Sequence, residues 1–453
     1  MMMKRALAVI LAAGFAVGVY ATDARVAVMG RQPGMPYFYR DEVSVFINPA
    51  DMSLYPNLIY GSFGWMEHDN VSLEQGQLKN LQPKDPLFGG MISYGFSDEE
   101  SGPMLSIGAF LNRRDYMVDK LIRAGGKGSR EFTSSVGAGG ATNTYLDPDA
   151  NNLVDPIGKF DVMLGYDMGN GFAMGLGFYT AYQCEKDNDE IRNETAIYKG
   201  SIGINYNIEQ GLDLEASVNG GVTNARYLRD GVGVGDYKDD NKVIDNTTTL
   251  PNLKYLKRVV SNGDYFLRGD LRFFSAVPAI NGSFVPQVSL TYMTLDLASM
   301  TDVAGGVGIN MNIDRGFFWT GLQGIYNQES GGASLGRTRI GARLSFGIER
   351  NIVWDWFLIR VGGQKEFQYM TYKTTDGINK SEWVENGPNK KEPKLDVPDG
   401  SDGDLVGLGF GINIDNRLRI DFVASEDLPY TLTNLISGSS YHLFNRVSAT
   451  YRF

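Results

Sequence analysis

The chain has 453 residues, of which 43% are hydrophobic and 21% charged, with 56 glycines. A mean hydropathy of -0.21, without any run of about eighteen apolar residues after residue 21, excludes a polytopic helical membrane protein. The formal charge of -11 argues against a general nucleic-acid binder, and one cysteine with two histidines excludes a disulfide framework and most histidine-based zinc sites.

Residues 1–21 have the features of a signal peptide. Lys4 and Arg5 precede an apolar stretch over residues 6–20, and Ala21 completes a small-x-small cleavage pattern. The apolar stretch is short for a membrane span, which makes an N-terminal anchor the weaker alternative. We therefore expect export to the bacterial envelope.

The next segment, residues 22–56, mixes apolar and polar residues without a clean alternation. It contains the stretch Asn48, Pro49 and Ala50. Asn-Pro initiates turns and would bend the segment back into the barrel predicted below. Two interpretations stay open: these three residues belong to a hatch inside the lumen, or the segment is a periplasmic lead-in.

From residue 57 onward the sequence alternates with period two. Within 160–168, for example, the even positions are Phe, Val, Leu, Tyr and Met, while the odd positions are Asp, Met, Gly and Asp. A helical period of 3.6 would scatter these apolar residues, so the segments are predicted as strands. Most run for about nine to thirteen residues, longer than ordinary strands and suited to crossing an outer membrane. The predicted strands are 58–66, 88–97, 104–113, 158–168, 172–182, 196–208, 212–222, 264–276, 284–296, 303–313, 317–327, 338–348, 354–371, 404–414, 417–425 and 441–453.

The connections between these strands tend to alternate between long and short. Residues 114–157, 223–263 and 372–403 are long and polar, whereas 169–171 and 314–316 are tight turns. Long loops on one rim and short turns on the other are typical of a transmembrane barrel. The predicted fold is therefore all-β: a closed antiparallel transmembrane β-barrel over residues 57–453, with sixteen strands counted and fourteen as the alternative.

The last predicted strand carries a specific signal. Phe453, Tyr451, Ala449 and Val447 share one face, with polar residues between them. A terminal Phe after such alternation resembles the C-terminal signal that the barrel-assembly machinery reads. Phe453 and Tyr451 are therefore the candidate assembly signal, with an aromatic side chain at the membrane interface.

Where apolar positions face lipid, the alternate positions face the lumen. The inward set holds eleven cations against six anions: Lys159, Lys199, Arg268, Arg272, Arg339, Arg343, Arg360, Arg417, Arg419, Arg446 and Arg452, against Asp161, Asp167, Asp213, Glu215, Asp270 and Asp421. The pore-lining candidates are Arg268, Asp270, Arg272, Arg339, Arg343, Arg360, Arg417, Arg419 and Arg446. Either these arginines form an anion-favouring constriction, or they pair with inward acids or with loop acids folded into the lumen.

The Asn48-Pro49-Ala50 stretch and the barrel layout together resemble the long-chain fatty-acid transporter (FadL-type) family. In that family the motif belongs to a small hatch inside a fourteen-stranded barrel. The resemblance implies uptake of hydrophobic compounds, with Asn48, Pro49 and Ala50 as hatch residues.

We expect a single-domain outer-membrane channel or transporter that passes small solutes, by porin-like diffusion or by FadL-like uptake. The alternative is a structural or adhesive surface protein acting through its long loops. Ser440 and His442 share a face but have no orienting acid nearby in the sequence, so we expect no enzyme, and neither a cofactor nor a metal. The expected partners are outer-membrane lipid and lipopolysaccharide, the barrel-assembly machinery and small solutes, without nucleic acid; a homo-oligomer is left open.

Overall fold

The computed structural model describes most of the chain from residue 23 onward. The described residues are 23–29, 38–66, 82–97, 102–118, 121, 131–135, 142–146, 156–187, 190–209, 211–230, 238–239, 242–243, 255–295, 298–331, 337–352, 354–373, 379–384, 404–415, 417–424 and 444–453. The predicted signal peptide, residues 1–21, lies outside them.

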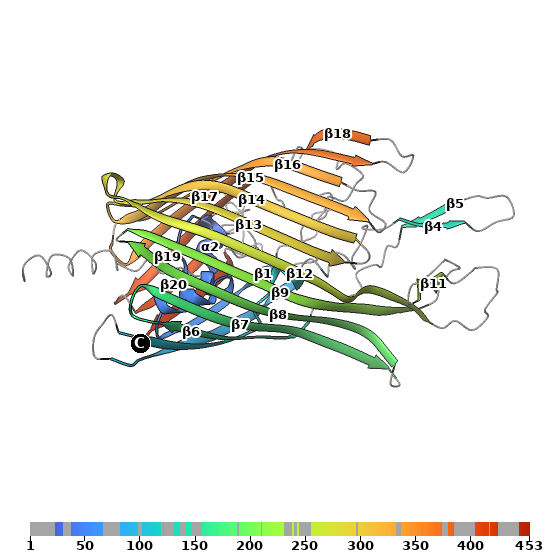
Figure 1. The fold of residues 1–453 in the computed structure, drawn as a ribbon, viewed down its shortest axis with the longest axis horizontal. Helices are drawn as coiled ribbons and strands as arrows, with labels where there is room; N and C mark the ends of the chain where they lie inside the picture. The colour runs from blue at the N-terminus through green and yellow to red at the C-terminus, as the bar shows by residue number, and fades with distance from the viewer. Residues whose placement is uncertain are drawn as a thin grey trace, which may run out of the picture.

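Sixteen antiparallel strands close into a barrel (Figure 1). They are β1 (Leu58–Met66), β2 (Gln82–Gly95), β3 (Met104–Leu111), β6 (Gly158–Asp167), β7 (Phe172–Asp187), β8 (Glu190–Glu209), β9 (Leu212–Asp230), β12 (Tyr255–Val277), β13 (Gly282–Leu295), β14 (Ala298–Ile313), β15 (Gly316–Gly331), β16 (Arg337–Asn351), β17 (Phe357–Lys373), β19 (Asp404–Ile414), β20 (Leu418–Ala424) and β21 (Phe444–Arg452). Each corresponds to one of the predicted strands, so the sixteen-strand count is confirmed.

Closure comes from the pairing of the first strand with the last. β1 pairs with β21 from Leu58 opposite Arg452 to Gly64 opposite Arg446, and with β2 on its other side. The sheet contains one further strand, β18 (Asn379–Val384), which pairs only with β17 and lies outside the ring. Closure leaves no unpaired edge inside the ring, which a sheet in lipid requires.

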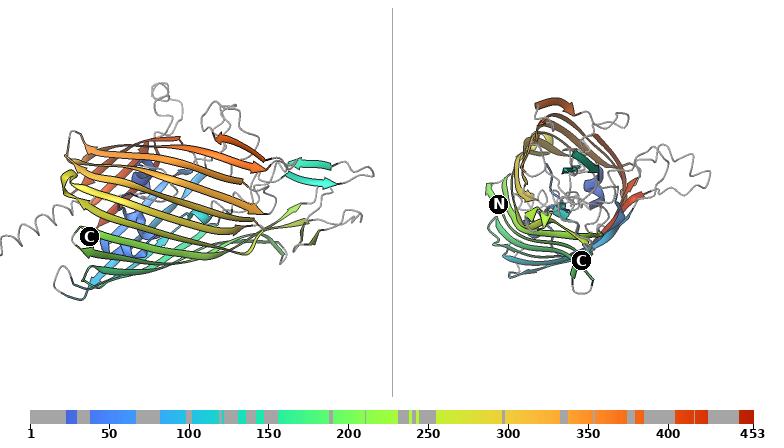
Figure 2. Two further views of the ribbon diagram at one scale, coloured as in Figure 1. Left: turned by 45° about the horizontal axis from the view of Figure 1, so that its top comes forward. Right: turned by 90° about the vertical axis from the view of Figure 1, so that its right-hand side faces the viewer.

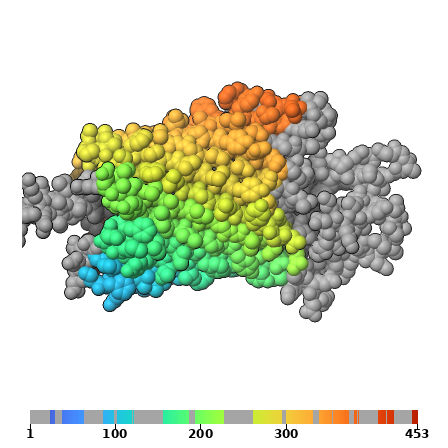
Figure 3. All heavy atoms as spheres, viewed as in Figure 1, coloured from blue at the N-terminus to red at the C-terminus, as the bar shows by residue number. Residues whose placement is uncertain are grey.

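The alternation in the sequence becomes an outside and an inside. In β6 the side chains of Phe160, Val162 and Leu164 are exposed, while Lys159 and Asp161 are buried in the lumen. The same pattern around the ring gives an apolar outer surface, whose wall over β7–β16 is continuous in the space-filling view (Figure 3). An apolar exterior is what lipid contact demands.

The two rims differ as predicted. Short connections, such as η4 (Pro278–Ile280) and the turn at Arg315, lie at the end of the barrel that holds the C-terminus (Figure 1). Asn281 and Arg315 adopt positive φ angles of 49° and 55° there, which lets the chain reverse within a few residues. The hairpins β4–β5 (Glu131–Ser135, Thr142–Leu146) and β10–β11 (Lys238–Asp239, Lys242–Val243) lie at the opposite end.

The structure extends some strands beyond their predicted ends. β9 runs to Asp230 and β12 starts at Tyr255, so much of the predicted loop 223–263 is a paired ribbon. Period-two patterning predicts only the part of a strand that has one face in lipid, because both faces are free to be polar beyond the membrane. The hydrogen-bonded pairing of β9 with β12 therefore continues beyond the alternating part of the sequence.

The N-terminal segment folds into the lumen, in the half of the barrel nearest the short turns (Figure 2). It comprises α2 (Asp23–Met29) and the two 3-10 helices η1 (Glu42–Phe46) and η2 (Pro49–Leu54), and it leads directly into β1. Among the described residues, no helix is both long and apolar enough to cross a membrane.

Candidate functional site in the barrel lumen

The Asn-Pro-Ala stretch starts η2 and fastens it to the wall. The Asn48 side chain caps η2 by accepting a hydrogen bond from the Ala50 amide at 3.1 Å, with Pro49 in the first turn. Its amide group donates to the carbonyl of Ile204 (3.3 Å) and to Oδ1 of Asn205 (2.6 Å), both in β8. The motif therefore acts as a local cap and as a contact between the N-terminal segment and the barrel.

Glycines in the wall make room for this segment. A Cβ on Gly407 would lie 2.6 Å from the Val28 carbonyl oxygen, and one on Gly203 would overlap the Asn48 side chain. The wall glycines that contact the segment include Gly165, Gly175 and Gly203 against residues 48–52, Gly308 and Gly321 against the Phe38 ring, and Gly362, Gly407 and Gly409 against α2. These eight glycines lie on seven strands, whose inner surface is thus shaped to the N-terminal segment.

Buried ion pairs join α2 to the wall around one carboxylate. Glu349 of β16 accepts two hydrogen bonds from Arg25 of α2, at 2.9 and 2.8 Å. It also accepts from Arg360 (2.9 Å) and Arg419 (3.2 Å), while Arg25 donates to Asp41 at 3.1 Å. Because all these side chains are buried, each charge depends on its partners, and removing one would strand the others.

A second cluster of buried charges holds η2 and Arg40, which lies two residues before η1. Arg40 donates to Glu215 of β9 at 2.6 Å, and Arg272 of β12 lies 2.5 Å from the same carboxylate. Arg272 also contacts Asp51 of η2 at 3.4 Å, and Asn205 donates to Asp51 at 2.8 Å. The N-terminal segment is therefore bonded to opposite sides of the wall.

Burial changes the titration of the acids in this segment. Burial and the neighbouring Glu215 carboxylate raise the pKa of Asp51 to about 7, against the lowering effect of Arg272. Burial likewise raises the pKa of Asp41 to about 6, against the effect of Arg25. Both carboxyl groups therefore exchange a proton closer to neutral pH than exposed aspartates do.

A second piece of chain enters the lumen from the long-loop side. β3 ends at Leu111, Asn112 adopts a positive φ of 62°, and the chain then turns inward. Residues 112–118 and Leu121 form what we call the inner segment. Its Arg113 makes a two-bond contact with Asp161 of β6, both bonds at 2.8 Å, and Asp115 pairs with Lys199 of β8 at 2.5 Å.

The inner segment covers an apolar cradle on the lumenal wall. Met117, Val118 and Leu121 are fully buried against inward-facing side chains from five neighbouring strands. The cradle residues are Tyr179 and Ala181 of β7, Ile197 of β8, Ala225 of β9, Phe266 of β12 and Met293 of β13. Lumenal surfaces of such barrels are normally polar, so an inward apolar patch of this size requires an explanation.

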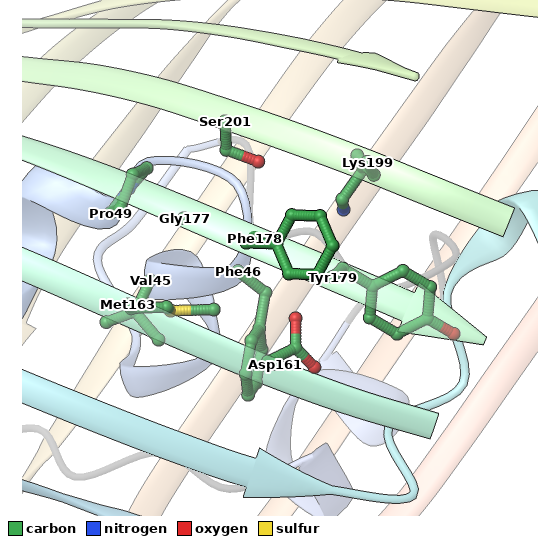
Figure 4. Close-up of a pocket in the computed structure, with 10 residues that line it drawn as sticks. All are labelled: Val45, Phe46, Pro49, Asp161, Met163, Gly177, Phe178, Tyr179, Lys199 and Ser201. Atoms are coloured by element: carbon green, nitrogen blue, oxygen red, sulfur yellow. The ribbon is translucent and has the colours of Figure 1, made fainter. Parts of the chain in front are cut away.

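A narrow cleft lies between the N-terminal segment and the wall strands β6, β7 and β8. Figure 4 shows Val45, Phe46 and Pro49 on one side of it, and wall residues such as Asp161 and Tyr179 on the other. The cleft has no room for a water molecule. In the described part of the chain, the packed segments therefore leave no ligand-sized cavity at this point.

The structure places the predicted pore-lining residues at different depths. Arg268, Arg272, Arg339, Arg360 and Arg419 are buried inside the barrel, Asp270, Arg343 and Arg446 are half-buried, and Arg417 is exposed in the turn before β20. Arg268 pairs with Asp270 on its own strand at 2.8 Å, and Arg343 pairs with Glu366. These contacts follow the alternative in which lumenal arginines pair with acids.

Several residues of these clusters are absent from the sequence-based candidates. Glu349 lies an even number of residues from Arg339 in β16, and Glu366 lies an even number from Arg360 in β17. Each therefore faces inward with its arginine, and applying the same alternation along the whole strand would have identified both. Arg25 and Asp41 carry no such signal, because they lie outside the alternating strands. Arg113 is the last residue of the predicted strand 104–113, where its parity is that of the outward-facing Ile107 and Leu111. The sequence therefore predicted that lumenal arginines could pair with acids, but it did not identify the charged residues of the N-terminal and inner segments as partners.

Other predicted residues have simpler positions. Tyr451 and Phe453 are exposed at the end of β21, as an aromatic at the interface would be. Ser440 and His442 lie outside the described residues. No group of three or more metal-ligating side chains occurs within the described part of the chain.

The fold defines the class of protein. A closed, even-numbered antiparallel barrel with an apolar exterior, short turns on one rim and long connections on the other is a bacterial outer-membrane β-barrel. Its lumen holds both the N-terminal segment and the inner segment.

Comparison with known proteins finds no matching family model and no matching curated protein. Among solved structures, the chain is similar to a FadL homologue of Pseudomonas aeruginosa, with 12% identity, a TM-score of 0.40, and coverage of 95% of this chain and 98% of that one. The P. putida toluene transporter TodX has 9% identity, a TM-score of 0.37 and the same coverage. OmpT of Vibrio cholerae has 8% identity, a TM-score of 0.30, and coverage of 88% and 98%.

The first of these neighbours bears the name of the family that the Asn-Pro-Ala stretch resembles. Similarity at this level does not assign the chain a function. The residues that fill the lumen therefore have to carry any functional conclusion.

Proposed function

We propose that this protein is an outer-membrane transporter for small solutes whose lumen is closed at rest by its N-terminal segment. Asn48, Pro49 and Ala50 are then hatch residues. The observation that carries this proposal is the fit between segment and wall: eight inward glycines receive it, and buried ion pairs centred on Glu349 and Glu215 hold it. A periplasmic segment that does not plug the lumen would need neither the glycines nor the buried ion pairs.

This proposal separates the protein from an open diffusion porin. An open porin keeps a water-filled channel along its axis. Here the N-terminal segment occupies the short-turn half of the lumen (Figure 2), and its Arg25, Asp41 and Asp51 side chains are buried. Passage of a solute therefore requires the N-terminal segment to move.

Single-channel conductance of the purified, refolded protein tests the proposal. Wild type should be closed for most of the time in a planar bilayer. Arg25→Ala removes the two hydrogen bonds to Glu349 from the segment side and leaves every wall residue in place. Loss of one partner of a buried pair costs about 3–5 kcal/mol, so this variant should open far more often.

The matched control is Arg350→Ala. Arg350 is exposed at the short-turn rim and pairs with Asp314 at 3.5 Å, a contact worth at most about 1 kcal/mol. It should behave as wild type. A wild-type channel that is stably open would contradict the proposal, and a silent Arg25→Ala barrel with normal heat-modifiable migration would favour the surface-protein alternative.

A specific observation favours hydrophobic compounds as the solutes. The apolar cradle formed by residues such as Tyr179, Ile197 and Phe266 is a lumenal surface that suits an apolar molecule. Cells that make the protein should take up radiolabelled naphthalene, and Phe266→Asn should reduce the initial rate. Ser217→Asn, at a buried inward position outside the cradle, is the control; equal effects of both substitutions would remove the support for an apolar solute.

A further inference from the structure

Two separate apolar clusters lie inside the barrel, one under each segment. The first is the cradle beneath Met117, Val118 and Leu121. The second packs Val45 and Met52 of the N-terminal segment against wall residues that include Phe110, the penultimate residue of β3. The inner segment starts two residues later, so one short stretch of chain contacts both clusters.

One side chain bridges the two clusters. The guanidinium carbon of Arg113 lies 4.7 Å from the ring centre of Phe46 in η1, and 4.6 Å from that of Tyr179 in the cradle. Phe46 also meets the Phe110 ring edge-on, at 4.9 Å between centroids. Arg113 is thus held between an aromatic ring of each cluster, an arrangement that attracts a cation on both faces.

The position of Arg113 depends on the inner segment staying in place. Its backbone carbonyl accepts a hydrogen bond from the Tyr179 hydroxyl at 3.1 Å, and its side chain is clamped by Asp161. Asp115, two residues on, is tied to Lys199. Because only three residues lie between Arg113 and Met117, withdrawal of Met117 from the cradle would pull on this whole set of contacts.

We propose that the inner segment and the N-terminal segment form one two-part gate, coupled through the contact of Arg113 with Phe46, which an apolar solute opens by taking the place of Met117, Val118 and Leu121 in the cradle. This deepens the proposed function and rests on it. The inner segment closes the gate on the long-loop side of the barrel, and the N-terminal segment closes it on the short-turn side. Arg113 is a positioning residue that transmits the loss of one set of contacts to the other.

The consequence is a defined order of events. A solute that fills the cradle makes the apolar contacts that Met117, Val118 and Leu121 make at rest, so the inner segment is no longer held. Arg113 then leaves the Phe46 ring, so η1 loses its contact with the inner segment while Phe46 still packs against Phe110. The coupling is reciprocal, since release of the N-terminal segment must loosen the inner segment by the same free energy.

Cysteine labelling of the full-length protein in liposomes tests this coupling. The single natural cysteine is first removed with Cys184→Ser. Ala24→Cys then reports on α2, and Val118→Cys, in a separate chain, reports on the inner segment; both positions are almost completely buried. The rate of reaction with a water-soluble maleimide measures how often each segment is released.

Leu121→Asn places a polar group in the cradle contact and should raise labelling at Val118→Cys. Coupling predicts that it also raises labelling at Ala24→Cys, by roughly tenfold or more. Adding Phe46→Leu should abolish this second increase, because the ring that receives Arg113 is gone. Met117→Ala replaces Leu121→Asn if that variant fails to show heat-modifiable migration.

The matched control is Phe38→Leu. Phe38 is also an aromatic residue of the N-terminal segment, but it packs against Gly308, Gly321 and Trp319, away from Arg113. It should raise basal labelling at Ala24→Cys and leave the response to Leu121→Asn intact. Comparing each single variant with the double variant then separates coupling between the two segments from a general loosening of the N-terminal segment.

Four outcomes overturn parts of this scheme. If Leu121→Asn raises labelling only at Val118→Cys, or if Phe46→Leu and Phe38→Leu act alike, the coupling is refuted while the closed lumen stands. If naphthalene does not raise labelling in chains without Leu121→Asn, the solute does not act at the cradle. If Ala24→Cys reacts freely in the parent chain, the proposed function itself fails.

Discussion

At the scale of single residues, the lumen is held by buried charges that face one another across segment and wall. Glu349 is shared by Arg25, Arg360 and Arg419, and Glu215 by Arg40 and Arg272. Each shared carboxylate joins the N-terminal segment to at least one wall strand. The docking of the N-terminal segment to the wall therefore depends on the protonation of a few acids.

Asp51 makes this grip dependent on pH. Its pKa rises from 3.8 to about 7 in the folded protein, so the docked segment holds a proton that a released segment gives up near neutral pH. The stabilisation is fully present below pH 3.8 and is lost as the pH rises through about 7. Raising the pH across neutrality should therefore loosen the segment.

The expected result is that the wild-type channel opens more often as the pH rises from about 6 to about 8. Asp51→Asn keeps a neutral side chain that can still accept from Asn205, so its opening frequency should stay low and vary much less with pH. Asp314→Asn, at an exposed turn, serves as the control in the same bilayer recordings. A pH profile of Asp51→Asn identical to that of wild type would assign the titration to another group.

At the scale of elements, the glycines of the wall decide where α2 can lie. The atoms nearest a Cβ built on Gly362 all belong to Val28 and Met29 of α2. A methyl group there changes nothing within the strand ladder, but it fills space that the helix needs. The substitution therefore acts on the N-terminal segment alone.

Gly362→Ala should displace α2 and increase channel opening, while heat-modifiable migration shows an intact barrel. Gly200→Ala is the comparison, since a Cβ there meets no atom within 4 Å. Both substitutions add one methyl group to a barrel strand. Equal conductance of the two variants would mean that α2 is not seated by this wall.

The elements also show which parts of the fold the sequence could predict. β1 and β19 have the predicted bounds, because lipid on one side and lumen on the other impose a period of two. The outer ends of β9 and β12 lie beyond that constraint and were missed. The inner segment sits within a long polar loop, where no periodicity marks Met117 or Leu121 as buried.

At the scale of the whole molecule, most of the arginines predicted to line the lumen are paired with acids. Arg268, Arg272, Arg343, Arg360 and Arg419 each have an acidic partner within the barrel. The sequence-based count of inward anions omitted Glu349 and Glu366, which pair with Arg360 and Arg343. Paired charges largely cancel one another's field in the lumen.

An opened channel should therefore select weakly between ions. In a salt gradient, the Arg25→Ala channel should reverse close to zero potential, with Glu349 then left to Arg360 and Arg419. Adding Arg343→Ala removes one cation beside Glu366 and should shift the reversal potential towards cation preference. A strong anion preference in Arg25→Ala would restore the interpretation of an arginine-lined constriction.

The N-terminal segment is made first, yet its partners are made last. Arg25 bonds to Glu349, which follows it by 324 residues, and the Ala24 amide donates to Ser448, which follows it by 424. Contacts of such sequence separation form late, after the chain between them has been ordered. The segment must therefore stay undocked until β16 and β21 are in position. Only a barrel whose ring of strands is complete can have its lumen filled by the N-terminal segment.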